Sequence, residues 1–375
     1  MRREPGRVTI STVAQRVGRS ISTVSAALND GPGVAHATRQ EILDAARELG
    51  YEADPRARSL RRRHTGLIGA RFATGQAFQG QVVDGLYQAC RMAGYSLVLS
   101  AATPERDGAD GLRALLAERC EGLVLVDAAP DAPTLRSAAS GVPMALICHD
   151  TDLPGLDVVR SRDDVGITAL VDHLVMTGRR EIVHVDGATA SATEVRTRAF
   201  LRAMAGHGLA GRARVVTGGA DEAAGARAAG RLLDGPALPE ALLCFNDHAA
   251  VGALMELRRC GVRVPQDLAV TGYDGIPVAS AFDLTTVEQD ARALAEVAVQ
   301  ALVARIGLST GGAGGTRGDE PGAGNGGPAL PAGVVKERRA AGGWAYEVMP
   351  RLHERGTTAP SVRGVRGPTS VVPCR

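Results

Sequence analysis

The chain has 375 residues, enough for about two to four domains, because one domain usually takes about 100–200 residues. Its formal net charge is only +2, but residues 1–63 hold 12 Arg and 7 acidic residues, a balance of +5, while the rest holds 31 Lys and Arg against 34 acidic residues, a balance of −3. This split indicates a small polyanion-binding arm on a nearly neutral body.

The six cysteines are scattered along the chain, with no Cys-x-x-Cys and no close Cys/His pair. Neither a disulfide framework nor a zinc site is therefore expected, and a reducing cytosol fits this distribution. The first residues carry charge but no apolar h-region, and no run approaches the ~18 apolar residues that would span a bilayer. We expect a cytoplasmic protein that is neither exported nor inserted in a membrane.

From about residue 66, short apolar runs alternate with helical stretches. The runs that predict strands are GLIGA, SLVLS, EGLVLVD, PMALICH, EIVHVDG, RARVVTG, EALLCFND and DLAVTGYDG. The stretches that predict helices are Phe78–Ala93, Ala109–Cys120, Gly166–Thr177, Thr193–His207, Glu222–Leu233, Ala249–Cys260 and Ala291–Ile306. Buried strands separated by helices indicate parallel βαβ units. The body is thus predicted to be α/β, with two similar parallel-sheet subdomains facing each other across a ligand-binding cleft.

Residues 309–342 change in composition to Gly, Pro and Ala, which predicts a flexible insertion. Within this segment, GAGNGG (Gly322, Gly324 and Gly327) formally matches the dinucleotide-binding pattern G-x-G-x-x-G. No predicted strand precedes the match and no predicted helix follows it, so we interpret it as a chance match. No cofactor and no metal site are predicted.

The stretch ISTVAQRVGRSISTVSAALND predicts two short helices joined at Gly18. Ser11 or Thr12 is expected to cap the first helix, and Ser20 the second. The residues of the first helix that are expected to face inward are Val13, Ala14 and Val17. A third helix is expected over Ala37–Leu49, with Gly50 as its stop. Its inward residues are expected to be Ile42, Ala46 and Leu49.

The second of these helices has two different faces on a helical wheel. Its predicted core face consists of Val24, Ala27 and Leu28. The opposite arc holds Ile21, Ser22, Ser25, Ala26 and Asn29. Three short helices with such an exposed face match a helix-turn-helix, whose second helix lies in the DNA major groove. The alternative is a small helical bundle whose Ser-rich face is merely solvated, and the pattern alone leaves the two about even.

The segment YEADPRARSLRRRHTG favours DNA binding. Asp54 is a good N-cap and Pro55 suits a first helical position, which predicts a short helix over Pro55–Arg61. Its basic residues, with the two that follow, are Arg56, Arg58, Arg61, Arg62 and Arg63. Leu60 is its only large apolar residue and could kink DNA as a minor-groove wedge. The alternative is a charged linker whose Leu60 packs on a neighbouring domain.

The chain resembles the LacI-type (LacI/GalR) family of transcriptional regulators over almost its whole length. The resemblance rests on VTISTVAQRVGRSISTVSAALND, PGVAHATRQEILDAARELGY, RARSL, CFNDHAAVGAL, GVRVPQDLAVTGYDG and LTTVEQD. Any one of these motifs alone is a weak signal, but their joint occurrence in this order is specific. The implied fold is an N-terminal all-α helix-turn-helix domain with a hinge helix, followed by a periplasmic-binding-protein-like body of two doubly wound parallel-sheet subdomains.

The resemblance implies which N-terminal residues contact DNA. Ile21, Ser22 and Ala26 match positions that contact base edges. Since Ile21 and Ala26 cannot donate hydrogen bonds, base readout is expected to use thymine methyl groups, Ser22 and the shape of bent DNA. The residues that match phosphate-binding positions are Thr9, Thr23, Ser25, Asn29 and Thr38.

In the implied hinge helix, Leu60 occupies the family's wedge position, with Ala57 beside it and Arg58 and Arg61 placed to meet the DNA backbone. Bending the DNA costs on the order of 1–6 kcal/mol, so two hinge helices are expected to pack together over the operator centre. The expected regulator is therefore a homodimer on a palindromic operator. Ala53 departs from the Pro that is usual in the family.

The implied body binds a small-molecule effector between its subdomains. Arg196, Asn246 and Asp274 match the family's effector contacts, and an Arg fork with an amide and a carboxylate grips vicinal hydroxyls such as those of sugars. Weaker candidates for the pocket are Phe78, Asp247 and Gln289. The predicted function is a transcriptional regulator, expected to be a repressor, that responds to a sugar. A nucleoside or another small metabolite is the alternative effector.

Two departures from the family weaken the choice of a sugar. Cys148 stands where many members have a pocket Asp, and Arg162 and Asp163 replace a common Asp-Asn pair. A transport-type sugar-binding protein would share the body but needs a secretion signal and has no use for residues 1–63. An α/β enzyme is not favoured, because no G-x-S-x-G, P-loop or H-E-x-x-H is present.

The resemblance also implies domain boundaries. The expected divisions are 1–52 (helix-turn-helix), 53–65 (hinge helix and linker), 66–308 with 343–360 (body), 309–342 (insertion) and 361–375 (tail). Within the body, the N-subdomain is expected over about 66–160 plus 291–308, and the C-subdomain over about 161–290 plus 343–360. Two segments are alternative candidates for the closing strand of the body. They are VMPRLHERGTTAP and, just upstream, the weaker copy LPAGVVKERRAA.

Overall fold

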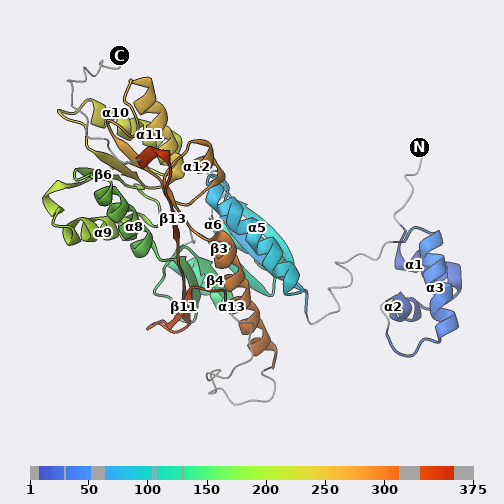
Figure 1. Ribbon diagram of the computed structural model, residues 1–375. Coiled ribbons are helices and arrows are strands. Elements are labelled where there is room, and N and C mark those ends of the chain that lie inside the picture. The colour runs from blue at the N-terminus through green and yellow to red at the C-terminus, as the bar shows by residue number, and fades with distance from the viewer. Residues whose placement is uncertain are drawn as a thin grey trace. The chain divides into compact units, whose positions relative to one another are not determined.

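The computed structural model describes residues 8–28, 31–51, 64–103, 105, 108–127, 131–311 and 330–358. The chain divides into two compact units, Met1–Thr65 and Gly66–Arg375. Figure 1 shows the elements of each unit.

The first unit contains three short helices. They are α1 (Ile10–Val17), α2 (Ile21–Leu28) and α3 (His36–Glu48). Thr9, not Ser11 or Thr12, is the N-cap of α1, because its extended backbone lets its side chain accept the Thr12 N–H and form a capping box. The prediction for this cap was therefore wrong. For α2, the prediction is confirmed, since the Ser20 hydroxyl accepts the Thr23 N–H at 3.1 Å.

The three helices close around a small apolar core. Its buried members are Val13, Ala14, Val24, Ala27, Ile42 and Ala46. All six were predicted to face inward, and Val17, Leu28 and Leu49 pack against the edge of this core. Gly18 has a φ of 62° where α1 ends, a left-handed conformation that favours glycine. The tight turn between α1 and α2 therefore depends on a residue without a Cβ.

The second unit, the body, contains a seven-stranded sheet in the order β11-β12-β5-β4-β3-β1-β2. The strands are β1 (Leu67–Ala73), β2 (Ser96–Ala102), β3 (Gly122–Val126), β4 (Met144–Ile147), β5 (Asp157–Ser161), β11 (Val334–Arg338) and β12 (Trp344–Val348). All neighbours are parallel except β11, which pairs with β12 in antiparallel fashion. We call this sheet and its helices the N-subdomain.

A second sheet has four parallel strands in the order β7-β6-β8-β9. Its strands are β6 (Ile182–Val185), β7 (Ala213–Val216), β8 (Ala241–Cys244) and β9 (Ala269–Thr271). We call it and its helices the C-subdomain. A two-stranded antiparallel sheet joins β10 (Thr286–Glu288) and β13 (Arg351–His353).

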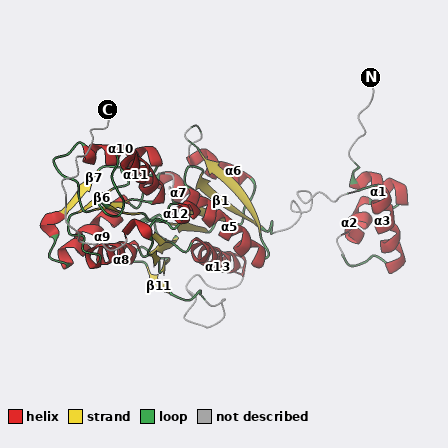
Figure 2. Cartoon of the chain, turned by 45° about the horizontal axis from the view of Figure 1, so that its top comes forward, coloured by secondary structure: helices red, strands yellow, loops and turns green. Residues whose placement is uncertain are grey.

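Helices cover both faces of each large sheet (Figure 2). The helices of the N-subdomain are α5 (Ala77–Met92), α6 (Gly108–Ala117), α7 (Ala132–Ala139) and α13 (Ala291–Gly311). Those of the C-subdomain are α8 (Asp163–Met176), α9 (Thr193–Gly206), α10 (Glu222–Leu233), α11 (Asp247–Arg259) and α12 (Pro277–Ala281), with short 3-10 turns at Ala210–Arg212 and Gly356–Thr358.

Alternate residues of β3 show how each sheet is covered. Val124 and Val126 belong to the core under α5 and α13, whereas Leu123 and Leu125 belong to the core under α6 and α7. Because successive side chains of a strand point to opposite faces, a strand buried on both sides is apolar throughout. This is why the parallel strands could be read from the sequence as continuous apolar runs.

The end of the body differs from the prediction. β12 pairs with β5, with Tyr346 opposite Val159, and buries Tyr346 and Val348 in the N-subdomain core. The sequence had assigned 343–360 as a whole to the C-subdomain, which only β13 joins through β10. β11 also shows that the predicted 309–342 insertion ends in a strand. β5, α7, α12 and β10 were not predicted.

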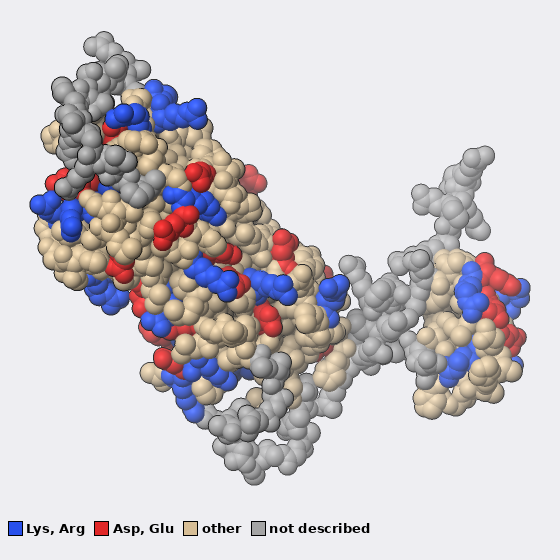
Figure 3. All heavy atoms as spheres, viewed as in Figure 1, with Lys and Arg blue, Asp and Glu red and all other residues tan. Residues whose placement is uncertain are grey.

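Four cysteines, Cys90, Cys120, Cys148 and Cys244, are free thiols. Across the described ranges, no cluster of His, Cys, Asp and Glu is arranged to hold a metal ion. Nor does any described helix have the length and apolar character needed to cross a membrane. On the face shown in Figure 3, basic and acidic side chains are interspersed over the body.

Candidate DNA-reading helix and effector cavity

The outward side of α2 presents the side chains that were predicted to meet DNA. Ile21, at its first position, is 45% exposed, and Ser22 is also exposed. Ser25 and Ala26 are half-buried on the same helix. Among the described residues of this unit, Ile21 is not part of the apolar core. The surface is therefore suited to an apolar contact with a partner.

Hydrogen bonds fix the start and end of α2. The Ser20 hydroxyl lies 2.8 Å from the Ser22 hydroxyl and 2.8 Å from the Thr23 hydroxyl. Arg39 of α3 donates to the carbonyl of Ala27 at 2.9 Å and to that of Gly31 at 2.7 Å. The hydroxyl bonds order the first turn of α2, and Arg39 holds the end of α2 against α3.

Two predicted phosphate contacts lie at other helix starts. Thr9 caps α1 and is exposed, and Thr38 is half-buried in the first turn of α3. Helix N-termini attract anions because their first N–H groups have no partner within the helix. The remaining predicted DNA contacts, Asn29, Ala57, Arg58, Leu60 and Arg61, lie outside the described residues.

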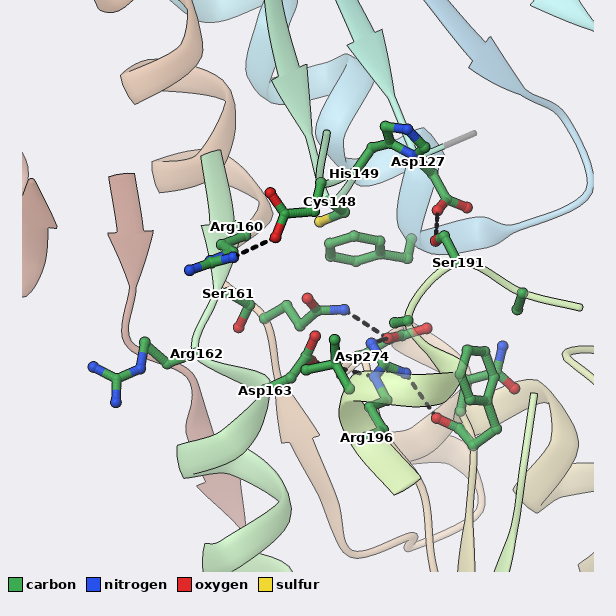
Figure 4. A pocket seen from close by; sticks show the side chains of 18 of the residues that line it. Asp127, Cys148, His149, Arg160, Ser161, Arg162, Asp163, Ser191, Arg196 and Asp274 are labelled. Atoms are coloured by element: carbon green, nitrogen blue, oxygen red, sulfur yellow. Dashed lines mark hydrogen bonds and ion pairs between the residues drawn. The ribbon is translucent and has the colours of Figure 1, made fainter. Parts of the chain in front are cut away.

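A cavity of about 870 Å³ lies in the body, and residues of both subdomains line it (Figure 4). Many of these residues follow the carboxyl ends of parallel strands, where ligands usually bind in α/β folds. Asp127 follows β3, Cys148 follows β4 and Asp274 lies beyond β9. All three have left-handed backbones, with φ of 64°, 55° and 104°. Such strained conformations in non-glycine residues are concentrated at functional sites.

Arg196 of α9 is the centre of the cavity's polar network. Its Nε donates to Asp163 at 3.2 Å, one terminal nitrogen donates to the Phe245 carbonyl at 2.8 Å and the other to Asp274 at 3.3 Å. The guanidinium also stacks on Tyr273, 3.9 Å from the ring centroid. Burial alone would lower the pKa of Arg196, but the two carboxylates raise it. The guanidinium is therefore a fixed, charged anchor.

Asp274 faces Arg196 and is also held by Gln289, whose side-chain amide donates to it at 2.7 Å. Burial raises the pKa of Asp274 to about 6, although Arg196 and Gln289 partly oppose this shift. One carboxylate oxygen accepts both protein hydrogen bonds. The other oxygen has no hydrogen bond from the described residues, so it can accept one from a ligand.

Asn246 connects the cavity to the opposite subdomain. Its side-chain oxygen caps α11 by accepting the Ala249 N–H at 2.9 Å, while its amide donates to the Ala220 carbonyl at 3.0 Å and to the Gln76 side chain at 3.1 Å. Gln76 precedes α5 in the N-subdomain and donates back to the Ala220 carbonyl at 3.1 Å. Asn246, which lines the cavity, therefore also forms a hydrogen bond between the two subdomains.

Two family models match the chain. The model for bacterial regulatory proteins of the lacI family covers residues 9–54, and the model for the periplasmic binding protein-like domain covers residues 171–320. The HTH-type transcriptional repressor PurR of Photobacterium profundum is 31% identical over 306 residues, which cover 80% of this chain and 92% of that protein. The chain belongs to the lacI family.

Solved structures agree with this assignment. A LacI transcriptional regulator from a Rhodococcus species is 36% identical, with a TM-score of 0.68 over 78% of this chain and 98% of that one. The lac repressor dimer bound to operator and the anti-inducer ONPF is 25% identical, with a TM-score of 0.76 over 94% of this chain and 100% of that one. The predicted fold and family are confirmed, and the chain is a DNA-binding transcription regulator.

Against this lacI-family framework, five of the six predicted effector residues line the cavity. They are Phe78, Arg196, Asn246, Asp274 and Gln289. Asp247 does not line it, because its carboxylate turns into the C-subdomain, where it accepts the Ile276 N–H at 2.9 Å and the Thr286 hydroxyl at 2.5 Å. Burial raises the pKa of Asp247 to about 7. Adjacent residues at a helix start point in different directions, which the sequence motif did not reveal.

Other residues of the cavity were not predicted. Asp127 accepts hydrogen bonds from Gln79, at 2.9 Å, and from Ser191 of the opposite subdomain. Asp127 ends the predicted run EGLVLVD, so its place after a strand was a signal that we did not use. Ser161 ends β5, a strand that the sequence analysis missed altogether.

Charged side chains form one rim of the cavity. Glu347 of β12 accepts hydrogen bonds from Arg160 at 2.7 and 3.1 Å and lies 3.3 Å from Arg162. Arg162 also forms two 2.9 Å hydrogen bonds with Asp164. Arg162 was noted as a departure from the family's Asp-Asn pair. The structure shows that this arginine is paired with acidic side chains at the rim.

Proposed function

We propose that the protein is a homodimeric transcriptional repressor that binds a palindromic operator and is controlled by a polar small molecule in the cavity of its body. The observation that carries this proposal is the combination, in one chain, of an exposed reading helix and a cavity whose Asn246 links two subdomains. PurR and the lac repressor are repressors by name, and the lac repressor structure is a dimer on its operator. Such a regulator would act in the cytoplasm, where chromosomal DNA lies.

In this proposal Ile21, Ser22 and Ala26 contact base edges. The exposure of Ile21 supports a contact with a thymine methyl group, which an apolar side chain recognises in the major groove. Thr9 and Thr38 bind phosphates from helix starts, with Thr23, Ser25 and Asn29 as the other phosphate contacts. These contacts would set the position of the protein on the duplex without reading its sequence.

The proposed hinge rests on the sequence alone. Leu60 would enter the minor groove as a wedge, flanked by Ala57, while Arg58 and Arg61 meet the backbone. We expect Leu60→Ala to reduce operator affinity and DNA bending and to leave effector binding intact. Bending measured by the mobility of circularly permuted operator fragments tests this, and undiminished bending would remove the wedge from the proposal.

The proposed effector is a sugar held by Arg196, Asn246, Asp274 and Gln289. Arg196 uses three of its five N–H groups on the protein, so two remain for a ligand. The free oxygen of Asp274 accepts at the same place, and Phe78 supplies an apolar wall. Adjacent donors and acceptors of this kind suit vicinal hydroxyls. A nucleoside is the alternative, since a cavity of about 870 Å³ also has room for a base and a ribose.

Effector binding would change operator affinity by changing the relation between the subdomains. Gln76 and Asn246 link them beside the effector, so a ligand that binds Asn246 prefers one arrangement of the two. Coupling of about 1–3 kcal/mol between two sites changes affinity by roughly 5–150-fold. The proposal is tested by sequencing the genomic fragments that the purified full chain retains, with and without candidate sugars and nucleosides.

A further inference from the structure

The charges that line the effector cavity do not balance. Seven carboxylates and five guanidinium groups line it, an excess of two negative charges. The rim holds four of each, and salt bridges such as Arg160–Glu347 pair several of them. The excess therefore belongs to the inner part, where Asp127, Asp163 and Asp274 face a single Arg196.

Asp127 is the inner carboxylate without a cationic partner among the described residues. Its two oxygens accept hydrogen bonds from Gln79 and Ser191, which are both neutral donors. His149 also lines the cavity, but burial lowers its pKa and favours the neutral ring. A negative charge in a partly buried site attracts a ligand cation more strongly than it would in water.

Ser161 is a second, independent indication of a ligand in this cavity. It is the last residue of β5 and lines the cavity wall, where Figure 4 labels it. The residue is only 4% exposed, and its hydroxyl has no hydrogen-bond partner among the described residues. A buried polar group without a partner destabilises the fold. A ligand hydroxyl at this position would remove this destabilisation.

We propose that the effector is a polyhydroxylated cation of the amino-sugar type, with its ammonium group against Asp127 and a hydroxyl on Ser161. An ammonium group offers three donors and one positive charge to a carboxylate that lacks a cation. A phosphorylated sugar would instead add negative charge beside three carboxylates, so this cavity disfavours it. The inference rests on the proposed function in one respect, which is that this cavity is the effector site.

Titration calorimetry on the full chain tests the charge preference. The probes are matched by ring, with D-glucosamine against D-glucose and D-glucose 6-phosphate, and D-galactosamine against D-galactose. At least one amino sugar is expected to bind about tenfold more tightly than its neutral match, a preference of about 1.4 kcal/mol. The phosphorylated probe is expected to bind most weakly. Asp127→Asn is expected to remove the preference for the amine over its neutral match.

Ser161→Ala tests the second contact, with Ser100→Ala as its matched control. Ser100 lies on β2 of the same sheet, is also 4% exposed and also has a hydroxyl without a partner among the described residues, but it is not part of the cavity wall. Ser161→Ala is expected to weaken the best probe about tenfold. Ser100→Ala is expected to leave its affinity unchanged.

Several results would overturn the inference. They are binding of none of the probes, equal or tighter binding of a neutral or phosphorylated probe, an amine preference that survives Asp127→Asn, and equal effects of Ser161→Ala and Ser100→Ala. None of them bears on whether the chain selects an operator. If the chain selects no duplex, the proposed function is refuted, but the binding data still show whether the cavity prefers an amino sugar.

Discussion

The side-chain amide of Asn246 donates a 3.1 Å hydrogen bond to the side-chain oxygen of Gln76, so a residue of the effector cavity also joins the two subdomains of the body. Both amides donate to one acceptor, the Ala220 carbonyl, at 3.0 and 3.1 Å. This small network is one physical route from an occupied cavity to the arrangement of the subdomains, and the hydrogen bond from Ser191 to Asp127 is another.

We predict that Gln76→Ala lowers the free energy of unfolding of the body and weakens its response to ligand. The variant loses the hydrogen bonds to Asn246 and Ala220, each worth about 1 kcal/mol net. Urea unfolding of the full chain should show a loss of about 1–2 kcal/mol in the transition of the body. Gln266→Ala, which changes an exposed glutamine whose side chain has no hydrogen bond to the described residues, is the control. Equal stability of the two variants would show that the subdomain contact contributes nothing.

Substitution of Arg196 should separate ligand response from DNA binding. Arg196→Ala leaves Asp163 and Asp274 without their cation, and breaking a buried ion pair costs about 3–5 kcal/mol. Arg196→Lys retains the positive charge but not the guanidinium fork, so it should fold better. Both variants should lose the thermal shift that a bound sugar or nucleoside gives the native chain, while Arg196→Lys retains operator affinity in a mobility-shift assay. A normal ligand shift in both variants would place the effector elsewhere.

The exposed Ile21 gives a test of base reading. If its side chain contacts a thymine methyl group, replacing that thymine with deoxyuridine should weaken binding by about 0.8 kcal/mol, the value of one buried methyl group. Ile21→Ala should lose a similar amount on the thymine operator and be indifferent to the replacement. Fluorescence anisotropy with single thymine replacements across the operator measures both effects. If the loss caused by Ile21→Ala and the loss caused by the thymine replacement add up at every thymine of the operator, Ile21 contacts no methyl group.

Asp247 should make the stability of the body depend on pH. Its pKa is about 7 in the folded chain, against about 3.9 for an ordinary Asp. A raised carboxyl pKa contributes stability that is fully present below pH 4 and is lost as the pH rises through 7. The free energy of unfolding should therefore decrease between pH 5 and pH 8, and this decrease should be larger in the native chain than in the Asp247→Asn variant.

The comparison with Asp247→Asn is necessary because other buried groups titrate in the same range. Burial lowers the pKa of His184 to about 4, so this histidine contributes stability that is lost as the pH falls below about 6.5. Its effect is opposite in sign and present in both proteins. Identical pH profiles, measured by denaturant unfolding, would contradict the role given to Asp247.

The sequence predicted most parallel strands of the body, because most of them contain an apolar run bounded by turn residues. β5 was missed, since its apolar positions Val158 and Val159 are followed by Arg160 and give too short a run. β12 was assigned to the wrong sheet, because its pairing with β5 joins segments almost two hundred positions apart. Local patterns carry no information about such a pairing.

The candidate site shows the same limit. The family motifs located Arg196, Asn246 and Asp274, which the structure brings to one cavity. They could not show that Asp247, one position after Asn246, turns into the protein interior. Ser161 was out of reach for a similar reason, because an unpaired buried hydroxyl is visible only once its surroundings are known.

Selection of duplexes from a random DNA pool by the full chain at modest salt, in the absence and presence of the amino sugars named above, tests the central claim most directly. We predict enrichment of one palindromic sequence and a change of roughly 5–150-fold in its affinity when a ligand occupies the cavity. No preference for any palindrome over random DNA, with or without ligand, would contradict the account of this protein as an effector-controlled operator-binding dimer.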